Sequence, residues 1–254
     1  MWAIRQFRAA GTSSSGTVLI VVVASRLDQG ARTLAASQGT DRVALLTCED
    51  LSVPGWRHYV AAAGTPVAVI DGREVPVEEI TGVVTCLPNV SELELLHIVP
   101  SDRAYVAAEM SAFLLSWLSA LSCPVLNRPS PTCLSGPYWR PEQWARVASE
   151  VGMRVQPVHR RVALDVGPAP AVTHGVTATV IGERCLGQAD TATLAAARRL
   201  ARAADVELLT VRVSGPEAGA TFLGADPWPD LTSEETVDAL LEYLEANAVS
   251  HGTR

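Results

Sequence analysis

Hydrophobic and polar positions alternate along this chain in two ways, which separate strands from helices. Short β-branched runs such as TVLIVVVAS (17–25) are typical of strands buried on both faces. Longer segments with apolar residues three and four positions apart, such as 190–205, are typical of helices. We expect strands over 17–25, 42–48, 65–72, 73–87, 123–131, 206–214 and 220–225, a hairpin over 176–187, and helices over 27–39, 101–122, 140–152, 190–205 and 233–248. This alternation predicts an α/β fold.

Turn and cap residues refine two of these elements. Asp71 and Gly72 stand between two strand-like runs and predict a tight hairpin turn. Ser101 precedes the most apolar helical segment, 101–122, and is expected to be its N-cap. This segment is apolar nearly all round, so we expect the helix to be buried.

Composition and charge exclude several classes of function. The chain has 254 residues and a net charge of −7, which provides no basic surface for nucleic acid or an anionic membrane. No apolar run reaches the length of a membrane span. All 20 basic residues are arginines. Without lysine, the chain can form neither a Schiff base with a substrate nor a P-loop lysine contact to phosphate.

Cysteine usage and the first residues indicate the compartment. The five cysteines are scattered and contain no C-x-x-C pair, so we expect buried thiols in a reducing cytosol and no structural zinc site. Residues 1–16 contain two arginines, but GTSSSG separates them from the apolar run and no cleavage pattern follows. We therefore interpret 1–16 as a flexible tail and predict a cytoplasmic protein.

Several segments together are similar to one family. YVAAEMSAFLLSWLSAL, CPVLNRPSP and RPEQWARVASEVGMRVQP resemble the N-terminal domain of ATP-grasp ligases, in the branch of glutamate ligases and peptide-maturation enzymes. VTATVIGERCLG and TFLGADPWPDL resemble the C-terminal half of the same family. The resemblance covers most of residues 17–249.

The resemblance implies a domain organisation with one large departure. Residues 17–158 would form a Rossmann-like pre-ATP-grasp domain, and 176–249 a truncated α+β C-terminal ATP-grasp half. Between them, 159–175 stand as a linker where the family has a whole lid subdomain. We therefore expect a degenerate relative without the lid.

The residues that hold magnesium and ATP in the family are also replaced. The family uses two lysines for the phosphates, and this chain has none. At the positions that resemble the family's metal ligands the chain has Arg212, Gly224 and Asp226. A guanidinium cannot bind magnesium and glycine supplies no carboxylate, so we predict neither a metal nor a cofactor.

Five residues remain as candidates for a site. Glu109 lies in the apolar helix and Asp226 follows the last strand, so both are candidate catalytic acids; for Glu109 the alternative is a satisfied buried carboxylate. Asn127 and Arg128 follow a strand at the expected ligand edge of the sheet and are candidate substrate-binding residues or parts of a structural turn. Arg212 is either a salt-bridge residue or a site for a carboxylate.

Two classes of function follow from these residues. The leading hypothesis is an ATP-grasp-like protein that has lost ATP and magnesium binding. It would act as a substrate-binding or partner subunit in a peptide or amino-acid modification pathway. The alternative is an ATP-independent enzyme that reuses the cleft for a small carboxylic or carrier-bound substrate. The expected partners are a peptide or small-molecule substrate and either a ligase, which would supply the lid, or a second copy of the chain.

Overall fold

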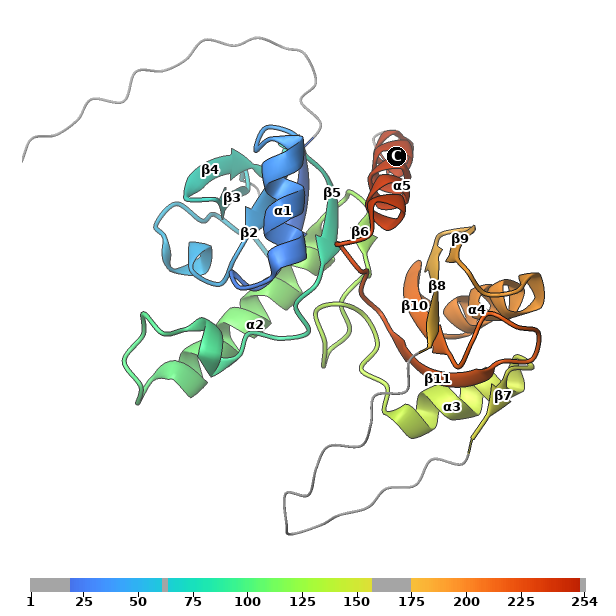
Figure 1. Cartoon of the computed structure of the whole chain (residues 1–254). Helices are drawn as coiled ribbons and strands as arrows, with labels where there is room; N and C mark the ends of the chain where they lie inside the picture. The colour runs from blue at the N-terminus through green and yellow to red at the C-terminus, as the bar shows by residue number, and fades with distance from the viewer. Residues whose placement is uncertain (1–18, 61–63, 157–174, 252–254) are drawn as a thin grey trace, which may run out of the picture.

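The computed structural model describes residues 19–60, 64–156 and 175–251, and shows two sheets with helices packed on and between them (Figure 1). The strands are β1 (Leu19–Val23), β2 (Val43–Leu46), β3 (Val67–Ile70), β4 (Arg73–Pro76), β5 (Ile80–Thr85), β6 (Val125–Leu126), β7 (Arg154–Val155), β8 (Val176–Ile181), β9 (Arg184–Gly187), β10 (Leu208–Val213) and β11 (Thr221–Asp226). The helices are α1 (Gln29–Gln38), α2 (Arg103–Ala120), α3 (Pro141–Glu150), α4 (Thr191–Ala203) and α5 (Glu234–His251), with short 3₁₀ turns η1 (Asp50–Ser52), η2 (Val77–Glu79) and η3 (Glu92–Glu94). The mixed α/β class expected from the sequence is confirmed.

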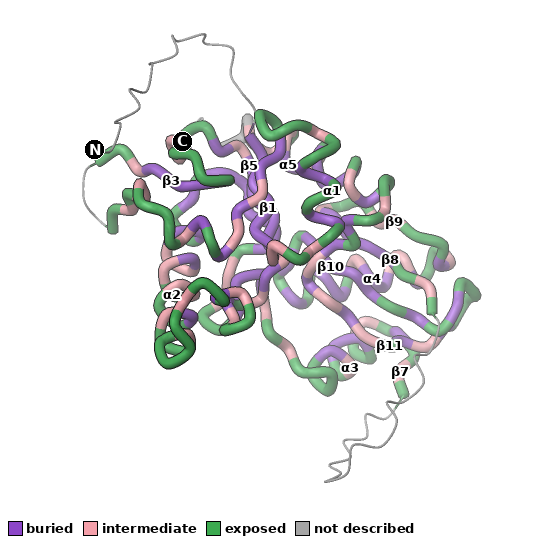
Figure 2. Tube along the Cα trace, turned by 60° about the vertical axis from the view of Figure 1, so that its left-hand side comes forward, coloured by how far each residue is buried: buried purple, intermediate pink, exposed green. Residues whose placement is uncertain are grey.

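The N-terminal sheet is parallel and has the strand order β2-β1-β5-β6. All five residues of β1 are buried, as its unbroken β-branched run predicts (Figure 2). Side chains of alternate β1 residues enter two different apolar clusters. Val21 and Val23 pack with Leu114, Trp117 and Leu118 of α2 on one face, and Ile20 and Val22 pack toward α1 and α5 on the other.

The C-terminal sheet has the order β7-β11-β10-β8-β9. Its central strand β10 pairs antiparallel with β8 and β11, whereas β7 runs parallel to β11. Two helices cover one face of this sheet. Leu200 of α4 and Trp144 of α3 lie in one buried cluster with Leu209 and Phe222.

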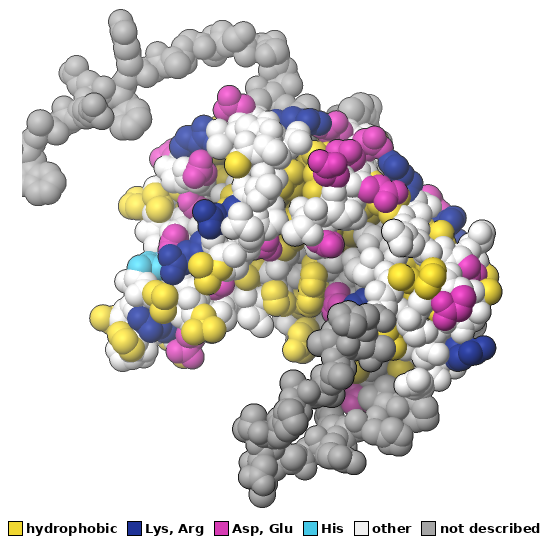
Figure 3. Space-filling view, viewed as in Figure 1, with side chains coloured by type: hydrophobic (Ala, Val, Ile, Leu, Met, Phe, Trp, Pro, Cys, Tyr) yellow, Lys and Arg dark blue, Asp and Glu magenta, His cyan; other side chains and the backbone are white. Residues whose placement is uncertain are grey.

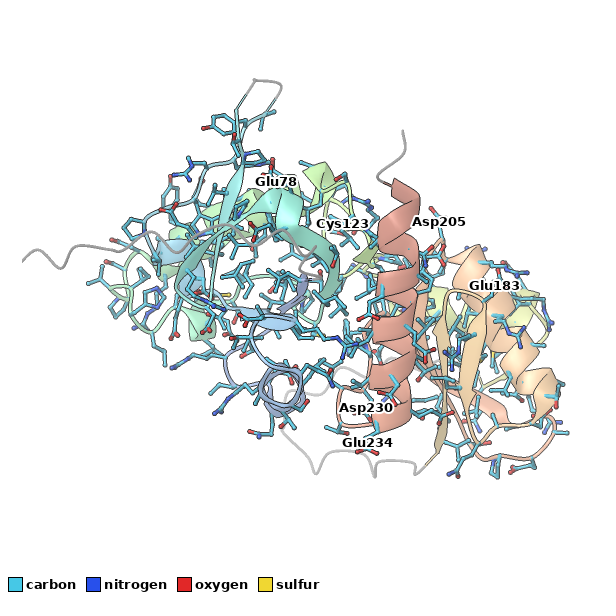
Figure 4. The ribbon with its side chains drawn as sticks, turned by 90° about the horizontal axis from the view of Figure 1, so that it is seen from above. Glu78, Cys123, Glu183, Asp205, Asp230 and Glu234 are labelled. Carbon is cyan, nitrogen blue, oxygen red and sulfur yellow. The ribbon has the colours of Figure 1, made fainter. Side chains whose placement is uncertain are left out.

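Helix α5 connects the two sheets by packing against both (Figure 4). Leu240 and Leu244 of α5 are fully buried in a cluster that contains Val22 of β1 and Leu208 of β10. Gly82 allows the close approach to β5, because a Cβ atom at this position would lie 3.0 Å from Cβ of Leu244. The two sheets therefore share a continuous apolar layer around α5.

The helix α3 and the strand β7 lie with the C-terminal sheet, although we expected them within the segment 17–158 of the N-terminal domain. The reason is the apolar face of α3, where Trp144 and Val147 pack against the C-terminal cluster. The expected linker over 159–175 falls almost entirely outside the described residues, and so does the tail over 1–16.

The local predictions hold for most turns and fail at α2. Asp71 and Gly72 form the expected hairpin turn between β3 and β4, and both have positive φ angles, 52° and 68°. The N-cap of α2 is Asp102 instead of Ser101, whose hydroxyl donates to the Asp102 carboxylate. The expectation of an all-round buried α2 is wrong, since Tyr105 is 69% exposed and one face of the helix lies toward solvent. Among the described residues, no helix is long and apolar enough to cross a membrane.

The buried amide of Asn127 links the two sheets directly. Its Nδ2 donates to the carbonyls of Leu208 and Pro227 at 2.9 Å each and to that of Ser135 at 3.3 Å. Its Oδ1 accepts from the backbone N–H groups of Glu207 at 3.1 Å and Leu208 at 2.8 Å. The side chain is 3% exposed and satisfies backbone groups at the start of β10 and after β11. It therefore holds these segments against the end of β6.

We expect Asn127→Ala to lower the free energy of unfolding by about 3 kcal/mol, because buried backbone groups of both halves lose their partners. Urea denaturation followed by circular dichroism measures the change. Asn89→Ala is the control, since Asn89 is exposed and its loss is expected to leave the midpoint unchanged. A change of less than 1 kcal/mol at Asn127 would contradict the role of this side chain in joining the sheets.

The cysteine thiols are buried or half-buried and free, as the scattered spacing predicts. Burial is the main reason that the pKa of Cys86 is raised to about 12, with a smaller contribution from Asp28. Burial likewise raises the pKa of Cys48 to about 12 and that of Cys123 to about 11. These thiols stay protonated at neutral pH, which makes them poor nucleophiles.

The raised pKa of Cys86 predicts alkaline instability. The folded state holds the thiol proton more tightly than the unfolded state, so this contribution is present below pH 9 and is lost as pH rises toward 12. We expect Cys86→Ala to reduce the loss of unfolding free energy in this window by up to about 1.4 kcal/mol per pH unit. Lysine, which would titrate in the same range, is absent. Val84→Ala, a buried substitution on β5 two residues before Cys86, should lower stability without changing this slope.

Candidate functional site

A concave site lies between α3 and β11, and we call it the C-terminal cleft. It has a volume of about 700 Å³. Its charged lining residues are Arg140, Arg212 and Asp226, and its lining indoles are Trp139, Trp144 and Trp228. The cleft therefore combines arginine, carboxylate and aromatic side chains at the edge of the C-terminal sheet.

Pairing of β10 with β11 brings the three metal-like positions of the sequence together. Arg212 lies directly across from Gly224, and Asp226 follows two residues later on β11. Nη2 of Arg212 lies 3.4 Å from Oδ2 of Asp226. A Cβ atom at Gly224 would lie only 2.9 Å from Nη2 of Arg212, so the missing side chain leaves room for the guanidinium.

This arrangement does not fit a magnesium ion. Mg²⁺ requires several oxygen ligands. Of the three positions, Asp226 supplies one carboxylate, Gly224 has no side chain, and Arg212 carries a permanent positive charge. The guanidinium also repels a cation at short range. In the residues described, no group of three His, Cys, Asp or Glu side chains is placed to hold a metal ion.

Indole rings form one wall of the cleft, and none of them is among the candidate site residues expected from the sequence. The rings of Trp139 and Trp144 have centroids 4.6 Å apart and are tilted by 51°. Trp228 follows β11 in a Pro-Trp-Pro turn, and its carbonyl accepts from the hydroxyl of Thr210 at 3.0 Å. In the sequence, the one available sign was that these tryptophans lie in or next to segments that resemble the ATP-grasp family. The three rings come together in one cleft because α3 packs against β11.

Asn127 and Arg128 are engaged by the protein's own backbone. The five hydrogen bonds of the Asn127 amide all go to main-chain groups. Arg128 donates to the carbonyls of Leu121 at 2.9 Å and Cys123 at 3.0 Å, which satisfies the end of α2. Neither residue lines the C-terminal cleft. The contacts correspond to the structural alternative, while substrate binding by these two residues stays an untested prediction.

Glu109 lies apart from the other candidates. It lines a separate depression of about 490 Å³ with Trp56, Met110 and Phe113. Of the suspected residues, only Arg212 and Asp226 therefore share a cleft. The proposed catalytic roles of Glu109 and Asp226 stay predictions.

The arginines of α4 make contacts within the chain. Arg199 donates to the carbonyl of Val151 at 2.9 Å, and Arg202 pairs with Glu183 at 2.5 Å. Burial raises the pKa of the Cys185 thiol, and the positive charge of the neighbouring Arg198 offsets part of this rise. These contacts join α4 to α3 and to the β8–β9 hairpin, so the basic face of this helix has a structural use.

Comparison with known proteins gives matches only at the level of structure. No family model and no curated protein matches the sequence. The macrocyclase MdnC bound with precursor peptide MdnA from Microcystis aeruginosa MRC is similar with a TM-score of 0.67 and 11% identity, over 89% of this chain and 99% of that chain.

Two other solved structures are similar over the same extent. A Chryseobacterium gregarium RiPP-associated ATP-grasp ligase, in complex with ADP and a leader and core peptide, has a TM-score of 0.61 and 10% identity over 90% of this chain and 97% of its own. The ATP-grasp ligase PsnB complexed with minimal precursor has a TM-score of 0.54 and 13% identity over 91% and 99%.

These matches confirm the resemblance seen in the helix, strand and turn segments of the sequence. At 10–13% identity the likeness concerns the fold. This chain has the fold of the RiPP-associated ATP-grasp ligases.

Proposed function

We propose that this chain is an ATP-grasp-like protein that has lost ATP and magnesium binding and serves as a peptide-binding partner subunit in a peptide modification pathway. The proposal includes a Rossmann-like pre-ATP-grasp part, a trimmed C-terminal ATP-grasp half and a linker without the lid. It also includes a cytoplasmic location, which the free, buried thiols favour. The similar ligases were solved with precursor peptides, which supports a peptide as the ligand class.

One observation carries the loss of ATP binding: the ion pair of Arg212 and Asp226 above Gly224. Phosphoryl transfer depends on cations that neutralise the phosphate oxygens. Arg212 and Asp226 form an ion pair with each other, and the guanidinium fills the space beside Gly224, where a carboxylate side chain would need to stand. The chain has no lysine to contact phosphates in place of the family's two.

The surface supports a role that includes a protein partner. The segment that leads into α2 exposes several apolar side chains, visible as a yellow group at the lower left of Figure 3. The exposed fractions are 77% for Leu93, 55% for Leu96, 63% for Val99 and 69% for Tyr105. Exposed apolar surface of this kind favours contact with another protein, here a ligase subunit or a second copy of the chain.

An ATP-independent enzyme is the rival function, and the geometry does not favour it. Such an enzyme needs several of the suspected groups in one cleft, whereas Glu109 lines a separate depression and Asn127 is bound by backbone. Asp226 is the one carboxylate among the described residues that line the cleft, and it is paired with Arg212.

Isothermal titration with Mg-ATP tests the proposal. We expect no heat of binding from the natural protein at concentrations where an ATP-grasp enzyme would be saturated. Arg212→Asp removes the positive charge and sets a second carboxylate beside Asp226, so it should bind Mg²⁺ measurably more tightly than the natural protein. Arg146→Asp is the matched control, because Arg146 lies on α3 outside the C-terminal cleft. Micromolar Mg-ATP binding by the natural protein would overturn the proposal.

A further inference from the structure

The outer edge of β11 is only partly paired. The parallel strand β7 pairs with Thr221 and Phe222 and ends at Val155. Beyond this point, Leu223 to Asp226 have β10 on one side and, within the described residues, no strand on the other. An unpaired strand edge presents backbone N–H and C=O groups that can hydrogen bond with another extended chain.

The part of the β11 edge that is unpaired among the described residues is a wall of the C-terminal cleft. All four residues from Leu223 to Asp226 line the cleft, and so does Gln156, which follows the end of β7. The edge of β11 along which β7 pairs therefore continues into the cleft. Four residues of strand have a length of about 13 Å, which suits a short extended peptide.

We propose that the C-terminal cleft binds an acidic peptide as an added β-strand along Leu223–Asp226, in line with β7. The inference rests on the proposed function and defines its ligand and binding mode. Strand addition uses main-chain hydrogen bonds for affinity and alternate side chains for specificity. The added strand completes the pairing of β11 that β7 leaves unfinished.

The charges of the cleft select an acidic ligand. Arg140 and Arg212 line it with a single carboxylate, Asp226, which gives a local excess of positive charge in a chain whose net charge is −7. The side chain of Arg212 is 55% exposed and its contact to Asp226 measures 3.4 Å. A weak, solvated pair of this kind can be exchanged for a bidentate contact with a peptide carboxylate.

The indole wall supplies the second specificity element. Trp139 and Trp144 lie on the α3 side of the cleft, opposite the edge of β11. Because side chains of a strand alternate between its two faces, a peptide on this edge would direct every second side chain to one face. The ligand that fits both walls has acidic and apolar residues in alternation.

Binding of a blocked hexapeptide of alternating Glu and Val tests the proposal, with the Lys–Val hexapeptide as its charge-reversed counterpart. Tryptophan fluorescence follows the titration, since three of the chain's six tryptophans line the cleft. We expect the acidic peptide to bind at least tenfold more tightly than the basic one. Arg212→Gln should weaken the acidic peptide at least fivefold, whereas Arg146→Gln, outside the cleft, should not change it.

A scan with N-methylated peptides tests the strand geometry. In strand addition, only alternate peptide N–H groups point to β11, so N-methylation at every second residue should lower affinity at least tenfold, and methylation at the others should not. Hydrogen exchange of the full chain should slow within 223–226 on binding.

The outcomes separate this inference from the proposed function. If the acidic peptide binds but N-methylation has no alternating effect, or hydrogen exchange within 223–226 does not slow, strand addition is overturned. The chain would then still be a peptide-binding protein. Failure of the natural protein to bind the acidic peptide, or equal binding of both peptides, overturns the acidic-strand proposal. Micromolar Mg-ATP binding overturns the loss of nucleotide binding, whatever the peptides do.

Discussion

The buried amide of Asn127 is the contact on which the arrangement of the two halves depends. It follows the N-terminal strand β6 and bonds main-chain groups at the start of β10 and just after β11. The Pro227 carbonyl that it holds is the neighbour of Asp226, and Trp228 comes next. The position of one wall of the C-terminal cleft is therefore fixed from the other half of the molecule. These contacts correspond to the structural alternative for this asparagine, while substrate binding by its side chain stays a prediction.

Three side chains of the cleft accommodate one another closely. Arg212 places a positive charge against the backbone of β11, and Gly224 has no side chain that would obstruct it. The carboxylate of Asp226 pairs with the guanidinium. These three residues are mutually compatible, and together they offer one carboxylate, which is fewer oxygen ligands than magnesium requires. The half-exposed guanidinium of Arg212 favours an anionic group over a cation.

The proposed functions rest on two different properties of the same strand. The side chains of β10 and β11 carry the proposed loss of magnesium-nucleotide binding, because the positive charge of Arg212 repels a metal ion beside the one carboxylate, Asp226. The main chain of β11 carries the proposed peptide strand, because among the described residues its outer edge is paired over only part of its length. In the proposal, the side chains exclude a magnesium nucleotide, and the main chain accepts a peptide. Both place the binding surface on the C-terminal sheet, which α5 and Asn127 hold against the N-terminal sheet.

The sequence by itself determined the features that depend on neighbouring residues. The β-branched run of β1 and the Asp71–Gly72 turn follow from local propensity, and both appear where expected. The sequence also shows that lysine is absent and that Arg212, Gly224 and Asp226 stand at the positions similar to metal ligands. Whether a side chain can bind a metal or a phosphate depends first on its own functional group, which the sequence gives directly. The family resemblance extended this reading to the fold.

Tertiary structure alone decided how distant segments meet. Hydrophobic pattern shows that α3 has an apolar face, but packing against β11 placed that face on the C-terminal sheet and gathered Trp139, Trp144 and Trp228 into one cleft. The expectation that α2 is buried all round is wrong, because an apolar composition does not show which faces of a helix other elements cover. The separation of Glu109 from Arg212 and the capture of Asn127 by backbone have the same cause: contacts between residues far apart in the chain are set by the packing of whole elements, which no local pattern encodes.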